Sequence, residues 1–493
     1  MMDRLSDSLT IVWFKRDLRL TDHAPLAQAV GENKPVLLLY IFEPDLLKDP
    51  HYDARHWRFV RQSLDEMSQK LRDKNLTLHT VVGDPLDIFE KLNKWYGIDK
   101  ILSHEETGIA KTFDRDKAVK RWCRAHGVAW DEHQTNAVVR GLMHRNDWRK
   151  RWRNTMRAEK RGPCLDDLQT VALSGNELEK LNESKLPFAA RKDKEHFQKG
   201  GSDRAWHCLK TFIKERGEKY NKTISKPLES RTGCSRLSPH ITWGTISLRE
   251  VYQYLRKHYE QSDFKWQLRS FESRLRWHCH FIQKFETEPR IEFENMNRGY
   301  DDIRTEKNQD FIEAWKSGQT GFPLVDACMR CVEQTGYINF RMRAMLVSFL
   351  THHLWQDWRH GAVHLGRCFL DFEPGIHYCQ FQMQAGTLGP NSVRVYNPVK
   401  QGRDHDPEGT FIKQWVPELR DIPGPQIHEP WALSRMEQEM FGCKIGRDYP
   451  LRLVDHKKTY KRANKILWSK KSESLVKKEN RRIKKKHVKP RRG

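Results

Sequence analysis

The segment Ser235–Ser238, which lies just after Gly233, carries groups suited to binding a phosphate. In Gly233-Cys-Ser-Arg-Leu-Ser238, two hydroxyls and a guanidinium come just after an expected turn at Gly233, where a helix is expected to begin. Free backbone N–H groups at a helix start, together with hydroxyl and guanidinium donors, bind phosphate or pyrophosphate oxygens. A plain helix cap made by the serines is the alternative that these residues leave open.

The cysteines predict no metal site. Cys328-Met-Arg-Cys331 is the only CxxC, and no second Cys pair stands at zinc-like spacing from it. The motif falls in a stretch with helical spacing, so both cysteines are expected to be core thiols. Nothing supports an iron–sulfur cluster, and the ten cysteines lack the close, even spacing of a disulfide scaffold.

Basic residues are concentrated at the C-terminal end. The net charge is +24, and from Lys457 onward 17 of 37 residues are Lys or Arg while two are acidic. We expect a solvated helix or coil that buries no core and binds a polyanion, because neutralised phosphates release counterions. A merely solubilising end is the alternative. The segment from Lys484 to Arg492 also resembles a nuclear import signal.

The rest of the composition predicts a folded protein. Aromatic residues make up 11% of the 493 residues, and 17 of them are tryptophan. No apolar run is long enough to cross a membrane, and the first residues are too acidic for a signal peptide. A cytoplasmic protein without a membrane partner is expected, with nuclear import left open.

Short apolar runs alternate with amphipathic stretches in the first part of the chain. Strands are expected at Leu9–Phe14, Val36–Phe42, Leu76–Val82, Lys100–Ser103 and Val128–Glu132. Helical periodicity covers Tyr52–Lys74 and Leu86–Tyr96 between them. This order predicts an α/β fold over residues 8–135, a Rossmann-like, doubly wound parallel sheet, although no GxGxxG follows the first strand.

The remaining chain divides into three further segments. Residues 136–201 are charged and punctuated by Gly and Pro, which is typical of an interdomain linker, with a helix expected around Asp147–Lys160. Residues 202–450 show helical spacing almost throughout, for example at Leu248–His258 and Thr335–Trp355, and predict an all-helical domain. Residues 451–493 form the basic tail.

Several blocks of sequence resemble the cryptochrome/photolyase family. Ile11-Val-Trp-Phe-Lys-Arg-Asp-Leu-Arg-Leu-Thr-Asp22 is similar to that family's first strand and loop. Further similar blocks follow in the family's order over residues 9 to 431, at Thr232–Ser247, Trp315–Arg330, Asn397–Gln401 and Trp415–Asp421. The resemblance implies an antenna-type α/β domain, a helical FAD-binding domain and light-driven electron transfer.

The resemblance also implies a set of FAD contacts. Arg343 and Asp371 would form an ion pair against the flavin ring and bias its charge state. Glu373 stands where the family usually has Asp, and His377 where it usually has Asn, Asp or Cys. We hypothesise that His377 sets which reduced form of the flavin persists, because imidazole titrates near neutral pH. The implied FAD-binding residues are Tyr220, Thr232, Ser235, Arg236, Leu237, Ser238, Arg343, Asp371, Phe372, Glu373 and His377.

The electron relay of the family is altered here. Trp358 occupies one of its three aromatic positions, but Phe381 stands at the position next to the flavin, and phenylalanine is too hard to oxidise. Trp355, Tyr378 and Tyr337 are the alternative routes, and the sequence does not choose among them.

On the substrate side, the residues that position DNA match the family and those that recognise the lesion do not. Arg341, Arg394, Gln401 and Lys226 match phosphate contacts, and Trp277 matches an aromatic that stacks on flipped bases. Simple core packing is the alternative for Trp277. The residues that depart from the pattern are Arg274 in place of Glu, Phe340 in place of Asn, Met383 in place of Trp, and Asn339 and Ala344 in place of a His pair.

The folate-contacting loop is altered as well. His104–Asp116 resembles it, but Ile109, Lys111 and Phe113 replace its Asn, Trp and Tyr, so an antenna pigment of the folate or deazaflavin type stays in doubt.

Together these residues indicate a DNA repair lyase driven by blue light and FAD. Its partner would be UV-damaged DNA, single- or double-stranded, and Trp277, His377, Arg343 and Asp371 would carry the chemistry. The alternatives are a cryptochrome-type photoreceptor that signals to a protein partner through flavin redox change, and a light-independent nucleic-acid-binding flavoprotein.

Overall fold

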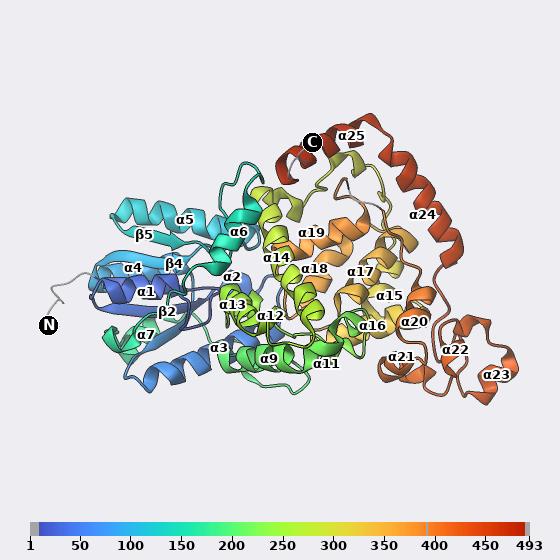
Figure 1. Ribbon diagram of the computed structural model, residues 1–493, viewed down its shortest axis with the longest axis horizontal. Helices are drawn as coiled ribbons and strands as arrows, with labels where there is room; N and C mark the ends of the chain where they lie inside the picture. Colours follow the sequence, from blue (N-terminus) through green and yellow to red (C-terminus); the bar gives the residue numbers. More distant parts are fainter. Residues whose placement is uncertain (1–8, 391–392, 489–493) are drawn as a thin grey trace. The chain divides into compact units, whose positions relative to one another are not determined.

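The computed structural model describes residues 9–390 and 393–488, which form two compact units. We call them the α/β unit, with residues 9–140, 147–214 and 237–286, and the helical unit, with residues 141–146, 215–236 and 287–488. Figure 1 shows their elements coloured along the sequence. The α/β domain predicted over residues 8–135 also included Ser8, which lies outside the described residues.

A five-stranded parallel sheet forms the centre of the α/β unit, in the order β3-β2-β1-β4-β5. All five predicted strands are present, and the first two have the predicted bounds. The strands are β1 (Leu9–Phe14), β2 (Val36–Phe42), β3 (Leu78–Val82), β4 (Ile98–His104) and β5 (Ala129–His133).

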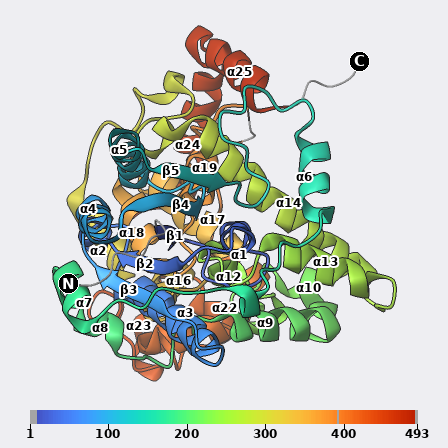
Figure 2. The same ribbon diagram turned by 90° about the vertical axis from the view of Figure 1, so that its left-hand side faces the viewer.

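Helices cover both faces of this sheet, which confirms the predicted α/β class (Figure 2). Residues alternate between the two faces of a strand, so Ile11 and Trp13 of β1 point to one core while Val12 and Phe14 point to the other. The former core packs on α4 (Pro85–Tyr96) and α5 (Ala110–His126). On the other side lie α1 (Ala24–Gly31) and α3 (Ala54–Arg72).

The segment expected to be a linker instead belongs largely to the α/β unit. Thr170 bridges to Val36 of the central sheet, and Leu173 and Leu181 are buried in its core. The segment is polar because only a minority of its positions face inward, among them Trp148, Trp152 and Met156 of its first helix. It contains α6 (Trp148–Arg157), α7 (Gly175–Leu181) and α8 (Phe188–Arg191).

Beyond Ser202 the described residues form helices and no strand, as predicted, but the first of these helices belong to the α/β unit. Those are α9 (Ser202–Lys214), α12 (Ser238–Thr242), α13 (Leu248–Tyr259) and α14 (Lys265–Thr287, whose last residue falls in the helical unit). The main helices of the helical unit are α11 (Ser230–Gly233), α15 (Gln309–Ser317), α16 (Pro323–Thr335), α17 (Phe340–Ser348), α18 (Arg359–Cys368), α19 (Pro374–Ala385), α20 (Pro398–His405), α21 (Thr410–Trp415), α23 (Arg435–Met440), α24 (His456–Lys471) and α25 (Ser474–His487).

The helix expected over Thr335–Trp355 is interrupted near its start. α16 ends at Thr335 because Gly336, with φ 72°, takes the left-handed conformation that closes a helix. Asn339 then begins α17 by accepting a hydrogen bond from the Met342 backbone N–H at 3.0 Å. The short break carries the chain from one buried helix to the next, and a π-helical turn, Phe349–His353, follows α17.

The basic tail is packed, which corrects the expectation that it buries no core. Leu467 in α24 and Val476 and Ile483 in α25 are almost fully buried, and the first two join a cluster around Tyr300. Apolar residues at helical spacing form one face of each helix while the lysines occupy the other. The expectation failed because it weighed charge alone. The last five residues of the tail, and with them the last four of the import-like segment, lie outside the described residues.

Candidate functional site

Arg343 and Asp371 form an ion pair at the centre of the helical unit. Arg343 Nη1 lies 3.0 Å from Asp371 Oδ1, and Nη2 donates to Oδ2 at 3.1 Å. Arg343 Nε donates to the Ile338 carbonyl at 2.9 Å, and the guanidinium stacks 4.0 Å from the Phe369 ring centre. These contacts to Asp371, Ile338 and Phe369 hold the guanidinium in one orientation beside a nearly buried carboxylate.

The start of α19 adds two more predicted residues to this neighbourhood. Glu373 is the buried N-cap residue of α19, and His377 lies in its first turn. His377 Nε2 lies 2.8 Å from the Ala362 carbonyl oxygen and therefore donates to it, so Nδ1 is the acceptor nitrogen of the neutral ring. Aromatic rings surround His377, with the ring centres of Phe372 at 5.1 Å and Phe381 at 4.7 Å.

The predicted phosphate-binding segment has a different turn from the one expected. Gly233 ends α11, and a Cβ there would come within 2.3 Å of Thr223 Oγ1, so close approach explains the glycine. The left-handed residue is Arg236, with φ 60°, whose guanidinium stacks 3.6 Å from the Tyr337 ring centre. α12 begins at Ser238 and has five residues, so its dipole adds little.

The other predicted residues of this segment lie beside the same turn. Tyr220 is buried at the start of α10 (Tyr220–Thr223), and Leu237 is the N-cap residue of α12. The Thr232 hydroxyl bonds to the Glu229 carbonyl at 3.3 Å, while Arg216 donates to the carbonyls of Thr232 and Cys234, each at 2.6 Å. Arg216 is therefore a residue that the sequence reasoning missed and that fixes the loop.

One buried donor near the ion pair has no partner among the described residues. The Asn339 side chain uses its oxygen to cap α17, which leaves Nδ2 buried without an acceptor. An unsatisfied buried amide costs about 1–3 kcal/mol, so such a group points to a ligand with acceptor atoms. This donor, the fixed charge pair and the aromatic rings fit a flavin ring, which carries carbonyl oxygens on a flat apolar body.

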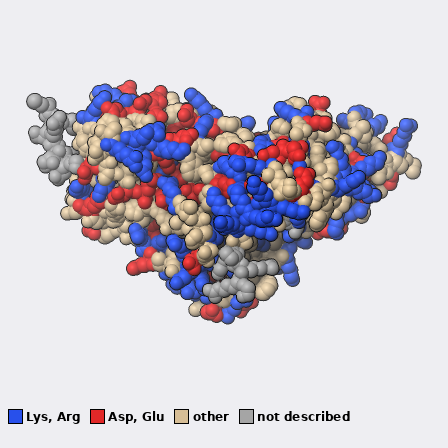
Figure 3. Space-filling model, turned by 90° about the horizontal axis from the view of Figure 1, so that it is seen from above, with Lys and Arg blue, Asp and Glu red and all other residues tan. Residues whose placement is uncertain are grey.

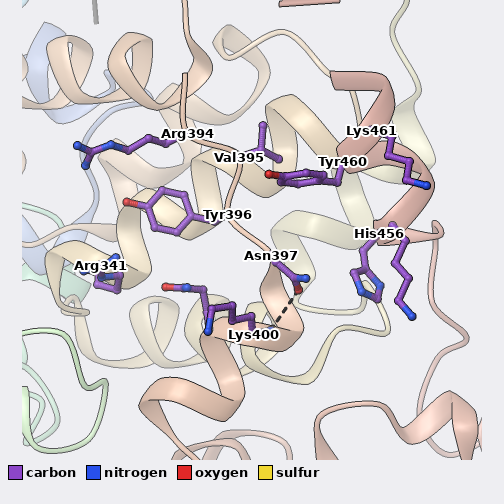
Figure 4. Close-up of a pocket in the computed structure, with 11 residues that line it drawn as sticks. Arg341, Arg394, Val395, Tyr396, Asn397, Lys400, His456, Tyr460 and Lys461 are labelled. Carbon is purple, nitrogen blue, oxygen red and sulfur yellow. Dashed lines mark hydrogen bonds between the residues drawn. The ribbon is translucent and has the colours of Figure 1, made fainter. Parts of the chain in front are cut away.

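A basic pocket of about 620 Å³ lies elsewhere on the helical unit (Figure 4). Two predicted arginines, Arg341 and Arg394, lie on one side of it, and α24 supplies Lys457, Tyr460 and Lys461. None of the described residues that line it is acidic, so it suits a polyanion. Its lining residues are Arg341, Arg394, Val395, Tyr396, Asn397, Lys400, Gln401, His456, Lys457, Tyr460 and Lys461.

The surface around α24 and α25 is also basic. Figure 3 shows broad patches of Lys and Arg on the face of the molecule that includes these helices. The fourth predicted phosphate contact, Lys226, pairs with Glu229 at 3.2 Å and does not line the pocket.

In the α/β unit, α14 presents the predicted stacking residue. The Trp277 side chain is 44% exposed and stacks on Phe281 with ring centres 5.6 Å apart, so it is a surface platform rather than core. Arg274 is exposed one turn earlier.

His278, the residue after Trp277 on α14, was missed by the sequence reasoning. Both of its ring nitrogens are buried without a hydrogen-bond partner among the described residues, and burial, with Arg16 nearby, lowers the pKa to about 4.

Two of the predicted electron-relay residues, Trp358 and Tyr378, are in contact. The rings of Trp358 and Tyr378 lie 6.0 Å apart, and Trp358 Nε1 donates to Asn295 Oδ1 at 2.8 Å. The ring of Trp355 instead contacts two guanidinium groups, with its centre 4.9 Å from that of Arg304 and 5.3 Å from that of Arg462.

The loop expected to contact an antenna pigment is used structurally. Ile109 is buried as the N-cap residue of α5, and Lys111 pairs with Asp49 at 2.9 Å. A separate pocket of about 380 Å³ opens at the carboxyl ends of the strands, where Arg19, His104 and His133 line it. Such an edge of a parallel sheet is where ligands bind in open α/β folds.

The comparisons with known proteins cover nearly the whole chain. Residues 10–153 match the model of the DNA photolyase family, and residues 271–469 match the FAD binding domain of DNA photolyase. The chain belongs to the cryptochrome/photolyase family. This confirms the resemblance found in the sequence, and the matched FAD-binding domain supports FAD as the cofactor.

Relatives in this family carry two kinds of name. The chain is 29% identical over 480 residues to a deoxyribodipyrimidine photo-lyase of Alkalihalophilus pseudofirmus, with 93% of this chain and 97% of the relative covered. It is 27% identical over 489 residues to a cryptochrome DASH of Synechocystis, with 92% and 97% covered. Family membership therefore leaves repair and signalling to be distinguished.

Solved structures in the family confirm the fold. The bacterial class III photolyase from Agrobacterium tumefaciens superposes with a TM-score of 0.82 at 26% identity, over 96% of this chain and 98% of that one. An archaeal photolyase from Sulfolobus tokodaii, described with two FAD molecules, gives 0.74 at 27% identity over 94% and 99%. Among the described residues, no helix of this cryptochrome/photolyase chain is both long and apolar enough to cross a membrane.

Proposed function

We propose that this protein is a blue-light-driven, FAD-dependent lyase that splits UV-induced pyrimidine dimers in DNA. The observation that carries the proposal is the basic pocket containing Arg341 and Arg394, because its lining has cationic and aromatic side chains and no acid. A nucleic-acid backbone is the polyanion that such a surface suits. The relative named deoxyribodipyrimidine photo-lyase supports the same activity.

The residues of the helical unit would hold FAD in defined ways. Arg343 and Asp371 would place a fixed positive and a fixed negative charge beside the ring, and Asn339 Nδ2 would be available to donate to an acceptor atom of the cofactor. Ser235, Arg236, Leu237 and Ser238 would bind the pyrophosphate, with Tyr220 and Thr232 beside them. Bound, reduced FAD would supply the light-activated electron that opens the dimer and would take it back from the split product, so that the reaction has no net redox change. Phe372, Glu373 and His377 would complete the wall of the site.

The substrate would be held by charge and stacking. Arg341, Arg394 and Gln401 contact the backbone phosphates, and Lys226 extends that contact. Trp277, exposed on α14, offers a flat face to bases flipped from the stack. Arg274 can only donate hydrogen bonds, so it reads pyrimidine carbonyl oxygens rather than N–H groups.

Before repair, an oxidised flavin would be photoreduced by an electron that travels through Tyr378 and Trp358. Their rings are in contact and buried, and Tyr378 adjoins His377. Trp355 is the poorer route because two guanidinium groups oppose the positive charge of an oxidised ring.

A photoreceptor is the second candidate function, and one observation favours it. Phe381 is buried 4.7 Å from the His377 ring, at the place where the family relays electrons through an oxidisable residue. Reduction by light would then be slow and sensitive to its surroundings, which suits a signal more than constant repair. The relative named cryptochrome DASH is consistent with this alternative, in which a protein partner reads the flavin state.

A single repair assay separates the two functions. The reduced protein is illuminated with oligonucleotides that carry one cyclobutane dimer or one (6-4) product, in single and double strands. We expect blue light to remove one of these lesions, and Arg341→Ala with Arg394→Ala to abolish that at substrate concentrations that saturate the unaltered protein. If light leaves every lesion intact, the lyase proposal is wrong. Fluorescence of pigments released on denaturation would identify any antenna of the folate or deazaflavin type.

A further inference from the structure

Three side chains of different ligand type meet between α16 and α18. Cys368 Sγ donates to Glu333 Oε2 at 2.9 Å and lies 3.7 Å from His364 Nε2. The three ligand atoms lie within 4.8 Å of one another. The flavin chemistry described above does not use them.

The positions of these residues follow from helix geometry. His364 and Cys368 stand four residues apart on α18, so they share one face of the helix. Glu333 reaches the same point from the last two turns of α16. Cys368 is buried, His364 is half-buried and Glu333 is exposed, so the cluster is closed on the protein side and open to water on the other.

This geometry matches the needs of a tetrahedral metal ion. Zinc binds thiolate at about 2.3 Å, imidazole at about 2.0 Å and carboxylate at about 2.0 Å, which separates neighbouring ligand atoms by roughly 3.3–3.6 Å. The observed 3.7 Å between sulfur and nitrogen is close to that range. The 2.9 Å contact between Cys368 Sγ and Glu333 Oε2 is shorter than this range. Because Glu333 is exposed, its side chain can rotate and lengthen that contact.

We propose that Glu333, His364 and Cys368 form a binding site for a divalent transition-metal ion of the Zn²⁺ class, with water as the fourth ligand. A mixed sulfur, nitrogen and oxygen set favours Zn²⁺ over the hard cations Mg²⁺ and Ca²⁺. On binding, the Cys368 S–H proton passes to solvent as the sulfur–metal bond forms, and no oxidation is involved. This proposal does not rest on the proposed lyase function.

A second cluster of ligand types, Asp17, His23 and His104, does not meet the same test. All three are buried, and Asp17 Oδ2 already accepts from His104 Nδ1 at 2.6 Å and from His23 Nε2 at 2.9 Å. His23 Nδ1 accepts in turn from the Leu26 backbone. Hydrogen bonds within the cluster and to the backbone therefore already occupy Asp17 Oδ2 and both ring nitrogens of His23.

An ion at the proposed site would brace the flavin pocket. Gly336, just after α16, accepts a hydrogen bond from the backbone N–H of Leu370 at 3.1 Å. Leu370 lies between Cys368 and Asp371, so joining Glu333 to Cys368 would tie the two segments that lead to the Arg343–Asp371 pair. An ion that binds only the folded state also raises thermal stability.

Cobalt absorption tests the site directly. The flavin-loaded protein is stripped with a chelator, kept reduced, and titrated with Co²⁺ in a Cys164→Ser background, because Cys164 is an exposed thiol. We expect one equivalent to bind with the intense ligand-field bands of tetrahedral cobalt, read in the red beyond oxidised flavin, and Zn²⁺ to displace it. Calorimetry with Zn²⁺ in two buffers should show release of about one proton.

Variants assign the ligands. Cys368→Ser should abolish the bands, and His364→Gln and the surface change Glu333→Gln should each weaken affinity at least about tenfold. His360→Gln, one turn earlier on α18, is the matched control and should leave affinity unchanged. The absence of tetrahedral bands, or bands that persist unchanged in both Cys368→Ser and Glu333→Gln, would overturn the proposal. Because Glu333 is exposed, its variant remains informative even if Cys368→Ser folds poorly.

Discussion

Single residues set the chemistry that a flavin would meet in this fold. The Arg343–Asp371 pair supplies fixed charge, whereas His377 supplies a buried imidazole that can both donate and accept a hydrogen bond. The hydrogen bond from His377 Nε2 to the Ala362 carbonyl fixes the neutral tautomer, so protonation at Nδ1 would convert an acceptor into a donor.

Replacing His377 by Asn should therefore remove a pH-dependent step from the flavin spectrum. We expect the absorption of the photoreduced protein to change between pH 6 and 9, and the midpoint to shift by about one pH unit or more, or vanish, in His377→Asn. His360→Asn, a more exposed histidine on α18, should behave like the unaltered protein. Spectra that coincide for His377→Asn and the unaltered protein across this range would refute the role.

At the scale of elements, α25 is held to the helical unit by an acid cluster. Glu288 accepts from His487 Nε2 at 2.8 Å and from Arg482 Nη1 at 2.7 Å, and it also pairs with Arg290. Burial alone would raise the pKa of Glu288, but the His487 hydrogen bond and the two guanidinium groups outweigh it and lower the pKa to about 2. A lowered pKa means that the contribution to stability is complete above about pH 4.5 and is lost as the pH falls through about 2.

Glu288→Gln should consequently loosen α25 at neutral pH. Allowing for solvent screening, the cluster contributes about 2 kcal/mol, so tryptic cleavage within the lysine-rich α25 should accelerate by about 30-fold at pH 7. Glu294→Gln is the matched control, because Glu294 is half-exposed and pairs with Arg290 and Arg298. Equal cleavage rates in the two variants would show that Glu288 does not anchor the helix.

Local sequence signals predicted most elements but not their long-range partners. The β1 and β2 bounds and the ends of α4 follow from apolar runs and from caps such as Asp84. The packing of α24 and α25 did not follow, because the few buried residues of the tail, such as Leu467, are outnumbered by lysines. Likewise, Gly336 and Asn339 divide a stretch whose apolar spacing alone indicates one helix.

The residues of the candidate site were likewise predicted only in part from the sequence. Arg343 and Asp371 were predicted as a pair through family resemblance and are in contact, although 28 residues separate them. The unpaired amide of Asn339 and the unpartnered ring of His278 could not be predicted, because an unsatisfied donor is visible only once its neighbours are placed. The same holds for the meeting of Glu333 with Cys368 across two helices.

At the scale of the molecule, the buried face of the C-terminal helices changes how DNA binding must be tested. Deleting the tail from Lys457 would remove Leu467, Val476 and Ile483 from the core, so lost affinity could reflect unfolding. Replacing exposed lysines by neutral residues should leave the helices folded, so that a change in DNA affinity reports the lost charge alone. Lys457 and Lys461 line the basic pocket, whereas Lys477 and Lys478 are exposed on α25 and do not line it.

Lys457→Gln with Lys461→Gln should weaken binding to damaged and undamaged DNA by the same factor. Each phosphate contact contributes about 0.9 to the slope of log affinity against log salt for duplex DNA, so losing two should reduce the magnitude of the slope by about 2. Fluorescence anisotropy across a salt series measures this. Lys477→Gln with Lys478→Gln removes equal charge and should leave the slope nearly unchanged, since those lysines lie outside the pocket. Equal slopes for the two double variants would mean that diffuse charge, and not this pocket, binds the backbone.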